Sequence, residues 1–378
     1  MNLIFVNKYL LFREQDRRNA VLLLFFCSLP LTALLPHAHT LCAIWVVLFL
    51  LFCGKDKHDF IALWEEKTAR CYTLFLVLCL SGCILPLARS ATLLSVTLRL
   101  SFLLPLLFSD KRREICRILA YTGGVFGGLT LLELFTGRGT ADYNDLSLFP
   151  SLWRASGLLG NPNVTAAFLL PAALFALSGM LFSKEKKWSY AVSFLGSALG
   201  VLATFSRGAI LALALSSFLL FARRFGLLRT SLTLVSFLPL SLFFLPSSLL
   251  ARLSSVLSPD SSVLYRFSLW KSIARLPASS LVFGVGEGRE ALLAALSPVL
   301  ASGLLHVEHT HSLFLHVLLS SGIVGLCLFL FLCARALLFG KSVGARAALL
   351  SLLLFGIFDD PLYSGQTEVL FWLVLGLC

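Results

Sequence analysis

The sequence is poor in charged residues. Only 13% of its 378 residues are Asp, Glu, Lys or Arg, and just 19 of them are acidic, whereas roughly a quarter of the residues in a soluble globular protein are charged. Hydrophobic residues make up 58% of the chain, and the mean hydropathy is +0.90. A protein of this composition has too few charged residues to cover its surface in water. The composition excludes a soluble enzyme, a disordered protein and a disulfide-rich secreted domain, and it leaves a polytopic membrane protein.

The sequence also lacks paired cysteine motifs. Its ten cysteines lie in or beside apolar runs, and none forms a CxxC pair. We interpret them as small apolar side chains of membrane helices rather than as metal ligands or disulfides. The first apolar run is not followed by a small-x-small cleavage site and a soluble domain, so we expect an uncleaved first span.

Long apolar runs are what the sequence does contain. A membrane-spanning helix needs about 20 apolar residues, and backbone groups in the bilayer find partners only within their own helix. We therefore predict an all-α polytopic membrane protein with about twelve transmembrane helices. The expected spans are 20–36, 40–53, 71–88, 91–108, 115–136, 165–183, 188–205, 208–222, 231–249, 312–334, 343–357 and 367–378.

The basic residues predict how these helices are oriented. Of the 31 Lys and Arg residues, 21 fall in every second connecting segment, at 8–18, 55–70, 111–117, 184–187, 223–229 and 335–346. Cytoplasmic loops carry such an excess of positive charge, so we expect both termini to be cytoplasmic. Because the net charge of +12 then reflects topology, we expect no nucleic-acid partner.

Two segments expected on the outer side are long, 137–164 and 246–311. Within the second, 261–275 has the spacing of an amphipathic helix that lies on the membrane surface among lipids. The residues on its expected apolar face are Val263, Phe267, Trp270 and Ala274. The glycines of FGVGEG (283–288) predict a tight turn, and a phosphate-binding loop is the weaker alternative because no βαβ unit surrounds them.

A few arginines lie on the outer side, against the charge rule. Arg207 falls at a tight hairpin between two spans, where its planar fork of donors suits an anion clamp. Arg154, Arg266 and Arg275 are further candidates. The alternative for all four is an anchor for lipid headgroups. Arg266 and Arg275 are nine residues apart, about half a turn out of phase, so one ligand cannot be gripped by both from one face.

An ionisable cluster, HVEHTHS (306–312), precedes the tenth span. Histidine titrates near neutral pH, so this cluster of His306, Glu308, His309 and His311 could supply a general base. The alternatives are a polar helix start and a metal site. We expect no metal, because His309 and His311 are two residues apart and should face opposite ways on an extended segment.

Charged residues also occur within or between spans. Arg99 and Glu133 lie inside spans, where charge is costly and indicates function by default, although the two could pair with each other or snorkel to the interface. Asp359 and Asp360 precede Pro361 at an outer hairpin. Turn formation is the simple interpretation of that pair.

Four segments in order resemble the O-antigen ligase and polymerase superfamily. They are RASGLLGNPN (154–163), ATFSRGAILAL (203–213), YRFSLW…FGVGEG (265–288), and His311-Ser312 followed after nine residues by Gly322-Ile-Val-Gly325. The last fits the ligase pattern H-[NSQ]-x9-G-x-x-G. Ser312 replaces the more usual Asn, and Leu326 stands where ligases often have Thr or Val. The resemblance covers roughly 154–330.

The resemblance implies a metal-independent, inverting glycosyltransferase of GT-C type in the bacterial inner membrane, with its active site on the periplasmic face and no cofactor. Its donor would be a glycan linked to undecaprenyl pyrophosphate, and its acceptor a lipid A–core hydroxyl. Carried over by motif, Arg207 and Arg266 would bind the donor pyrophosphate, and His311 would activate the acceptor. Arg154, His309, Arg275 and Glu308 would be supporting residues.

The expected organisation is a single membrane domain (1–378) with a long periplasmic loop of interfacial helices (246–311) and a ligase-like core (154–330). An O-antigen polymerase, which joins lipid-linked repeat units, is the alternative within the same class. The alternative from another class is a lipid-linked glycan transporter or flippase. A transporter would carry charges near the midplane of several spans, together with paired, broken helices.

Overall fold

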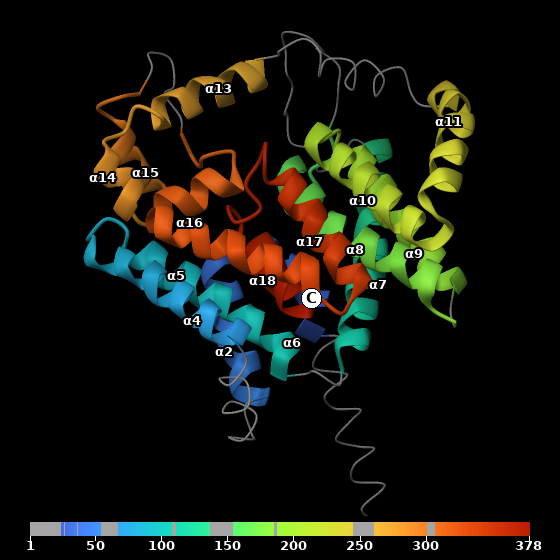
Figure 1. Cartoon of the computed structure of the whole chain (residues 1–378), viewed down its shortest axis with the longest axis horizontal. Coiled ribbons are helices and arrows are strands. Elements are labelled where there is room, and N and C mark those ends of the chain that lie inside the picture. Colours follow the sequence, from blue (N-terminus) through green and yellow to red (C-terminus); the bar gives the residue numbers. More distant parts are fainter. Residues whose placement is uncertain are drawn as a thin grey trace, which may run out of the picture.

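In its described part the chain is built of helices. The computed structural model describes residues 24–25, 27–35, 37–53, 67–107, 111–136, 154–184, 187–244, 261–300 and 307–378, and these contain no strand (Figure 1). This confirms the all-helical class. Residues 20–23, 26 and 36 of the first expected span (20–36) and the stretch 245–260 lie outside the described residues.

The helices follow the apolar runs of the sequence. Their bounds are α2 (Ala38–Cys53), α4 (Lys67–Leu80), α5 (Arg89–Arg99), α6 (Leu104–Leu107), α7 (Arg112–Thr136), α8 (Pro162–Phe182), α9 (Lys187–Ala203), α10 (Arg207–Phe225), α11 (Leu227–Phe244), α13 (Ser261–Ile273), α14 (Ala278–Phe283), α15 (Arg289–Leu296), α16 (Leu313–Phe339), α17 (Val343–Phe355) and α18 (Gly365–Leu377). Short 3-10 turns η1 (Pro30–Leu34), η2 (Ser81–Ile84) and η3 (Leu100–Leu103) lie among them.

Five of the described helices are long and apolar enough to cross a membrane, and four shorter apolar helices accompany them. The five are Arg89–Leu107, Arg112–Thr136, Pro162–Phe182, Arg207–Phe225 and Leu313–Phe339. They support a membrane-embedded protein. They leave the expected count of about twelve spans as a prediction.

The molecule has a buried centre and an apolar outer surface. Every residue of α18 is buried, and α8 is buried over most of its length. Figure 1 shows α13, α14 and α15 at one end, with the C-terminus and α6 toward the other. Large apolar side chains such as Phe135 and Val125 are largely exposed on α7, as expected of a surface that faces lipid rather than water.

Small residues let α7, α8 and α9 approach closely. A methyl group at Gly127 would lie 2.2 Å from the carbonyl oxygen of Gly196, and one at Gly200 would lie 2.5 Å from Cα of Gly127. In a bilayer, helices associate through such close packing because the hydrophobic effect does not drive them together. The backbone contact fixes α9, whose C-terminal end leads into the hairpin that carries Arg207.

α16 is broken at Gly322, which has a φ of 70° inside the helix. A methyl group there would lie 2.2 Å from the carbonyl oxygen of Val282, so α14 fills the break. The carbonyl oxygen of Leu319, freed by the break, accepts a hydrogen bond of 2.6 Å from the backbone N–H of Val285. Gly284, Gly286 and Gly288, in the turn that follows α14, all have positive φ, which confirms the predicted tight turn.

The surface helix α13 ends at Ile273, close to the predicted end, and one of its sides is buried in the protein. Leu269 and Ile273 are buried against the side chains of α15, whereas Phe267 and Ala274 are exposed. Because α13 packs on protein on one side, its second apolar side points outward, and contact of that side with lipid stays a prediction. That outward side is the one available to lipid.

Candidate functional site

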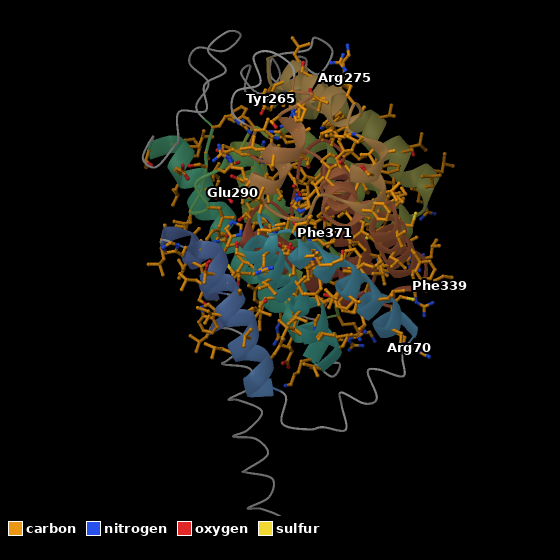
Figure 2. The ribbon with its side chains drawn as sticks, turned by 90° about the vertical axis from the view of Figure 1, so that its left-hand side faces the viewer. Arg70, Tyr265, Arg275, Glu290, Phe339 and Phe371 are labelled. Carbon is orange, nitrogen blue, oxygen red and sulfur yellow. The ribbon has the colours of Figure 1, made fainter. Side chains whose placement is uncertain are left out.

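Three arginines from separate parts of the chain border one hollow at the α13 end of the molecule. A cavity of about 390 Å³ is lined by Arg154, Arg266, His309, His311 and Asp359, among others. An adjoining pocket of about 50 Å³ is lined by Arg154, Arg207 and Arg266. We call the two together the cationic cavity. Figure 2 shows Tyr265, which lines it, at the end of the molecule opposite Phe339.

Arg154 lies in the loop that precedes α8, and two hydrogen bonds hold its guanidinium. Its Nε donates to the carbonyl oxygen of Thr204 and its Nη2 to Oδ1 of Asn163, both at 2.9 Å. Glu133 supports the same loop, because its carboxylate accepts hydrogen bonds from the backbone N–H groups of Ser156 (3.1 Å) and Gly157 (2.7 Å). Glu133 therefore does not pair with Arg99, and the pairing considered from the sequence was wrong.

Arg207 begins α10 directly after a three-residue turn. α9 ends at Ala203, and Phe205 adopts a φ of 50°, which confirms the tight hairpin expected here. Arg207 lies at the N-terminal end of a 19-residue helix, where unpaired backbone N–H groups add partial positive charge. Helix and side chain both favour an anion in the cationic cavity.

Among the described residues, Asp359 is the carboxylate that contacts Arg266, His309 and His311. Its Oδ2 lies 3.4 Å from Arg266 Nη2, and its Oδ1 lies 3.5 Å from His309 Nε2 and 3.7 Å from His311 Nδ1. Burial alone would raise the pKa of Asp359, but the two neighbouring histidines and the charge of Arg266 outweigh burial and hold the pKa well below its usual value. Asp359 is therefore ionised.

His311 faces the same carboxylate as His309. Its φ of 51° departs from an extended strand, and the two imidazole rings lie 3.9 Å apart. The expectation that these side chains face opposite ways was wrong, because alternation holds only for extended backbone. Burial lowers the pKa of His311, and the neighbouring Asp359 opposes this in part. A neutral imidazole at neutral pH can accept a proton.

Neighbouring helices fix the position of the histidine segment. The indole N–H of Trp270 on α13 donates to the carbonyl oxygen of Thr310 at 3.0 Å. The backbone N–H of Leu313, which begins α16, donates to the carbonyl oxygens of Gly356 and Asp359. These bonds place the segment between α13 and the α17–α18 turn, so His311 and Asp359 meet there.

His309, His311 and Asp359 could together hold a metal ion, because their ligand atoms lie within 4.8 Å of one another. Two imidazoles and a carboxylate are a common donor set for divalent metals. However, Arg266, a permanent cation, lies 3.4 Å from the same Asp359 carboxylate. Its charge opposes a second cation, so the group fits a metal poorly.

The remaining two sequence candidates differ in position. Glu308 lines the cationic cavity and accepts a hydrogen bond of 2.9 Å from the Tyr363 hydroxyl, while the Tyr363 ring stacks on His309 at 4.1 Å. Arg275 is exposed and lines neither part of the cationic cavity, although Figure 2 shows it at the same end of the molecule as Tyr265. The structure thus brings all the candidates together except Arg275.

A second cavity of about 460 Å³ shares Glu308, His309 and Tyr363 with the cationic cavity. Glu287, His316 and Glu368, which come from distant segments, are among its lining residues. Glu287 forms ion pairs with Arg99 and with His316 Nε2, the latter at 2.9 Å. Arg99 also pairs with Glu368 at 3.2 Å, and His316 Nδ1 lies 2.6 Å from Asp360. We call these five residues the buried charge network.

Sequence analysis missed most of this network. Glu287 and Arg99 are 188 residues apart, and Glu368 and Arg99 are 269 apart, so no local pattern joins them. The usable signal was Arg99 itself, because an arginine inside a span requires a buried anion. Asp359 and Asp360 do form the predicted turn, in which Asp360 Oδ1 accepts from the backbone N–H of Leu362. That interpretation overlooked their contacts with histidine and arginine.

Comparison with known proteins was made for the whole chain. Residues 191–330 match the family described as O-antigen ligase. The matched part runs from α9 into α16 and contains Arg207, Arg266 and His311, whereas Arg154 precedes it. No curated protein and no solved structure matches the chain.

Proposed function

We propose that this chain, whose residues 191–330 match the O-antigen ligase family, transfers a glycan from an undecaprenyl-pyrophosphate carrier to a lipid A–core hydroxyl. The family supports ligase or polymerase activity within a membrane. The observation that carries the proposal is the cationic cavity, where Arg154, Arg207 and Arg266 border one hollow with His311. Three fixed cations suit a pyrophosphate, and a neutral imidazole beside them suits activation of an alcohol.

The reaction follows from this arrangement. His311 takes the proton of the acceptor hydroxyl as the oxygen attacks the anomeric carbon of the donor sugar. The bond from that carbon to the pyrophosphate oxygen breaks, and the electron pair leaves on undecaprenyl pyrophosphate. Arg154, Arg207 and Arg266 stabilise the negative charge that grows on the leaving group. Attack opposite the leaving group inverts the anomeric centre.

Asp359 would act on this reaction through its neighbours. Its ionised carboxylate holds Arg266 on one side and the two histidine rings on the other. It stabilises the imidazolium that forms when His311 takes the proton, as a carboxylate beside a catalytic histidine does in other enzymes. Asp359 is thus a positioning residue for this reaction.

The transporter hypothesis has less support. The break at Gly322 is one feature that transporters show, but here α14 packs into it and Val285 N–H takes the freed carbonyl. The buried charges also form ion pairs with one another. Both features favour a protein with one fixed conformation over a transporter that alternates between two conformations.

Lipopolysaccharide from cells that carry Arg207→Ala or His311→Ala tests the proposal. A ligase defect leaves bare core with glycan still on its lipid carrier, whereas a polymerase defect leaves core capped by a single unit. We expect the first pattern for both variants. Arg275→Ala is the matched control, since Arg275 lies outside the cationic cavity, and it should resemble wild type. Wild-type lipopolysaccharide from both site variants would overturn the proposal.

Chelation tests metal independence with the purified chain. Because Arg266 supplies positive charge beside Asp359, EDTA should leave the transfer rate unchanged. Loss of activity in EDTA, restored by one added divalent metal, would instead assign a metal to His309, His311 and Asp359.

A further inference from the structure

A separate cavity of about 320 Å³ lies at the opposite end of the molecule from the cationic cavity. Its lining comes from η3 and α6, the start of α7, and the C-terminal ends of α16 and α18. Phe339 is one of the lining residues, and Figure 2 shows it far from Tyr265 and Arg275. We call this hollow the basal cavity.

The polar part of the basal cavity is cationic. Arg112, Arg335 and Lys341 line it, and its described lining contains no Asp or Glu side chain. Arg112 Nε donates to the carbonyl oxygen of Pro105 at 3.2 Å, which holds the guanidinium at the turn before α7. Cys378 also lines the cavity, and even a terminal carboxylate there would be one negative charge against three positive ones.

The rest of the lining is apolar and leads to the lipid-facing surface. Phe102, Leu332 and Leu375 form a buried wall, whereas Phe339 is 74% exposed. Leu338 beside it is also largely exposed. A cation that serves only topology extends outward to the headgroup layer. Here three cations and a hydrocarbon wall enclose one hollow that opens beside the membrane.

We propose that the basal cavity binds an anionic phospholipid, with the headgroup phosphate among Arg112, Arg335 and Lys341 and an acyl chain against Phe339. Basic pockets between transmembrane helices on the cytoplasmic side bind anionic headgroups. The three cations belong to segments that the charge pattern assigns to that side. The site contacts the ends of α16 and α18, so it would stabilise helices that carry His316 and Glu368. It does not depend on the proposed reaction.

Lipid binding to the purified full-length chain in detergent tests this site. Native mass spectrometry or the anisotropy of a labelled lipid would compare phosphatidylglycerol with phosphatidylcholine. We expect preference for phosphatidylglycerol and a roughly fivefold loss of its affinity for each cation removed in Arg335→Gln and Lys341→Gln. Arg335→Lys should retain most binding, because it keeps the charge with little change in packing.

The matched control is Arg223→Gln/Arg224→Gln. These cations are exposed at the end of α10, are expected on the same side of the membrane, and lie outside the basal cavity. The double variant should bind phosphatidylglycerol as wild type does. Equal binding of both lipids, or equal loss in the control, would overturn the proposal. Displacement of phosphatidylglycerol by millimolar inorganic phosphate would assign the site to free phosphate instead.

Discussion

Asp359 shows how one residue can organise a site without a motif of its own. It contacts Arg266, 93 positions earlier in the chain, and both histidines of the ionisable cluster. Arg154, Arg207, Arg266 and His311 could be chosen from the sequence because their residue type and position already suggested chemistry. Asp359 could not, because an Asp-Asp-Pro turn has a sufficient local explanation.

The pH dependence of transfer should report His311. Burial lowers its pKa below the usual 6.5, and the base must be neutral to act. The rate should therefore stay high as pH falls to 6.5 and decline only at lower pH, where His311 becomes protonated. Asp359→Asn removes the contacts that oppose this lowering, so it should move the decline further toward acid and also reduce the maximal rate.

The matched control is Tyr363→Phe. It removes the hydroxyl that bonds to Glu308 and keeps the contacts of Asp359 with His309 and His311, so its pH profile should follow wild type. Transfer rates of the purified wild-type enzyme and of both variants, measured from pH 5 to 8, would test these expected profiles. A decline centred above pH 6.5 in the wild-type enzyme would contradict the assignment of His311 as the base.

Among the elements, α16 carries the clearest conflict between local preference and tertiary packing. Its sequence is continuously apolar, and the expected span 312–334 was a single helix. The structure breaks it at Gly322, where the turn after α14 presses against the backbone. Gly322 and Gly325 of the ligase pattern indicated this position in the sequence. The pattern did not indicate that α14 fills the break. The break puts Val285 against Leu319 and so fixes the turn that carries Glu287.

Gly322→Ala should destabilise the protein. The backbone there has φ 70° and ψ −177°, a region open almost only to glycine, at a cost of about 1–3 kcal/mol for other residues. The added methyl group would also lie 2.2 Å from the Val282 carbonyl oxygen. Thermal unfolding in detergent should show a lower midpoint. Gly128→Ala is the control, since nothing lies within 4 Å of its added methyl group; an equal midpoint for wild type and Gly322→Ala would contradict the account.

At the scale of the whole molecule, the buried charge network joins α5, the glycine turn, α16 and α18. Burial alone would raise the pKa of Glu287, but the charges of Arg99 and His316 hold it at about 2. Removing one partner of a buried pair leaves an uncompensated charge. Glu287→Gln should lower the free energy of unfolding by about 3 kcal/mol, whereas Glu290→Gln, at an exposed position, should change it little.

The same variant should alter the pH dependence of stability. The folded-state pKa of Glu287 is about 2, below its usual 4.5, so its stabilisation is complete above pH 4.5 and is lost as pH falls toward 2. Unfolding midpoints measured from pH 7 to 3 should fall less steeply for Glu287→Gln than for wild type. Parallel curves would show that Glu287 is not ionised in the folded protein.

The sequence by itself determined the class of the molecule and the chemistry of its site candidates. Apolar runs and alternating basic loops are local properties, so a helical membrane protein could be inferred from them, and three arginines on the outer side indicated an anionic ligand. Tertiary structure alone decided which charges meet. Arg99 pairs with Glu287 and Glu368 rather than with Glu133, because a buried charge pairs with whatever the packed helices bring near it.

The direction of side chains was likewise a tertiary property. His309 and His311 face one carboxylate because the contacts of α13 and the α17–α18 turn impose a positive φ at His311. The charge of +12 and the scarcity of acidic residues were visible from the start. Which basic residues line the cationic cavity at one end and the basal cavity at the other was decided only by the packing of helices that are distant in the chain.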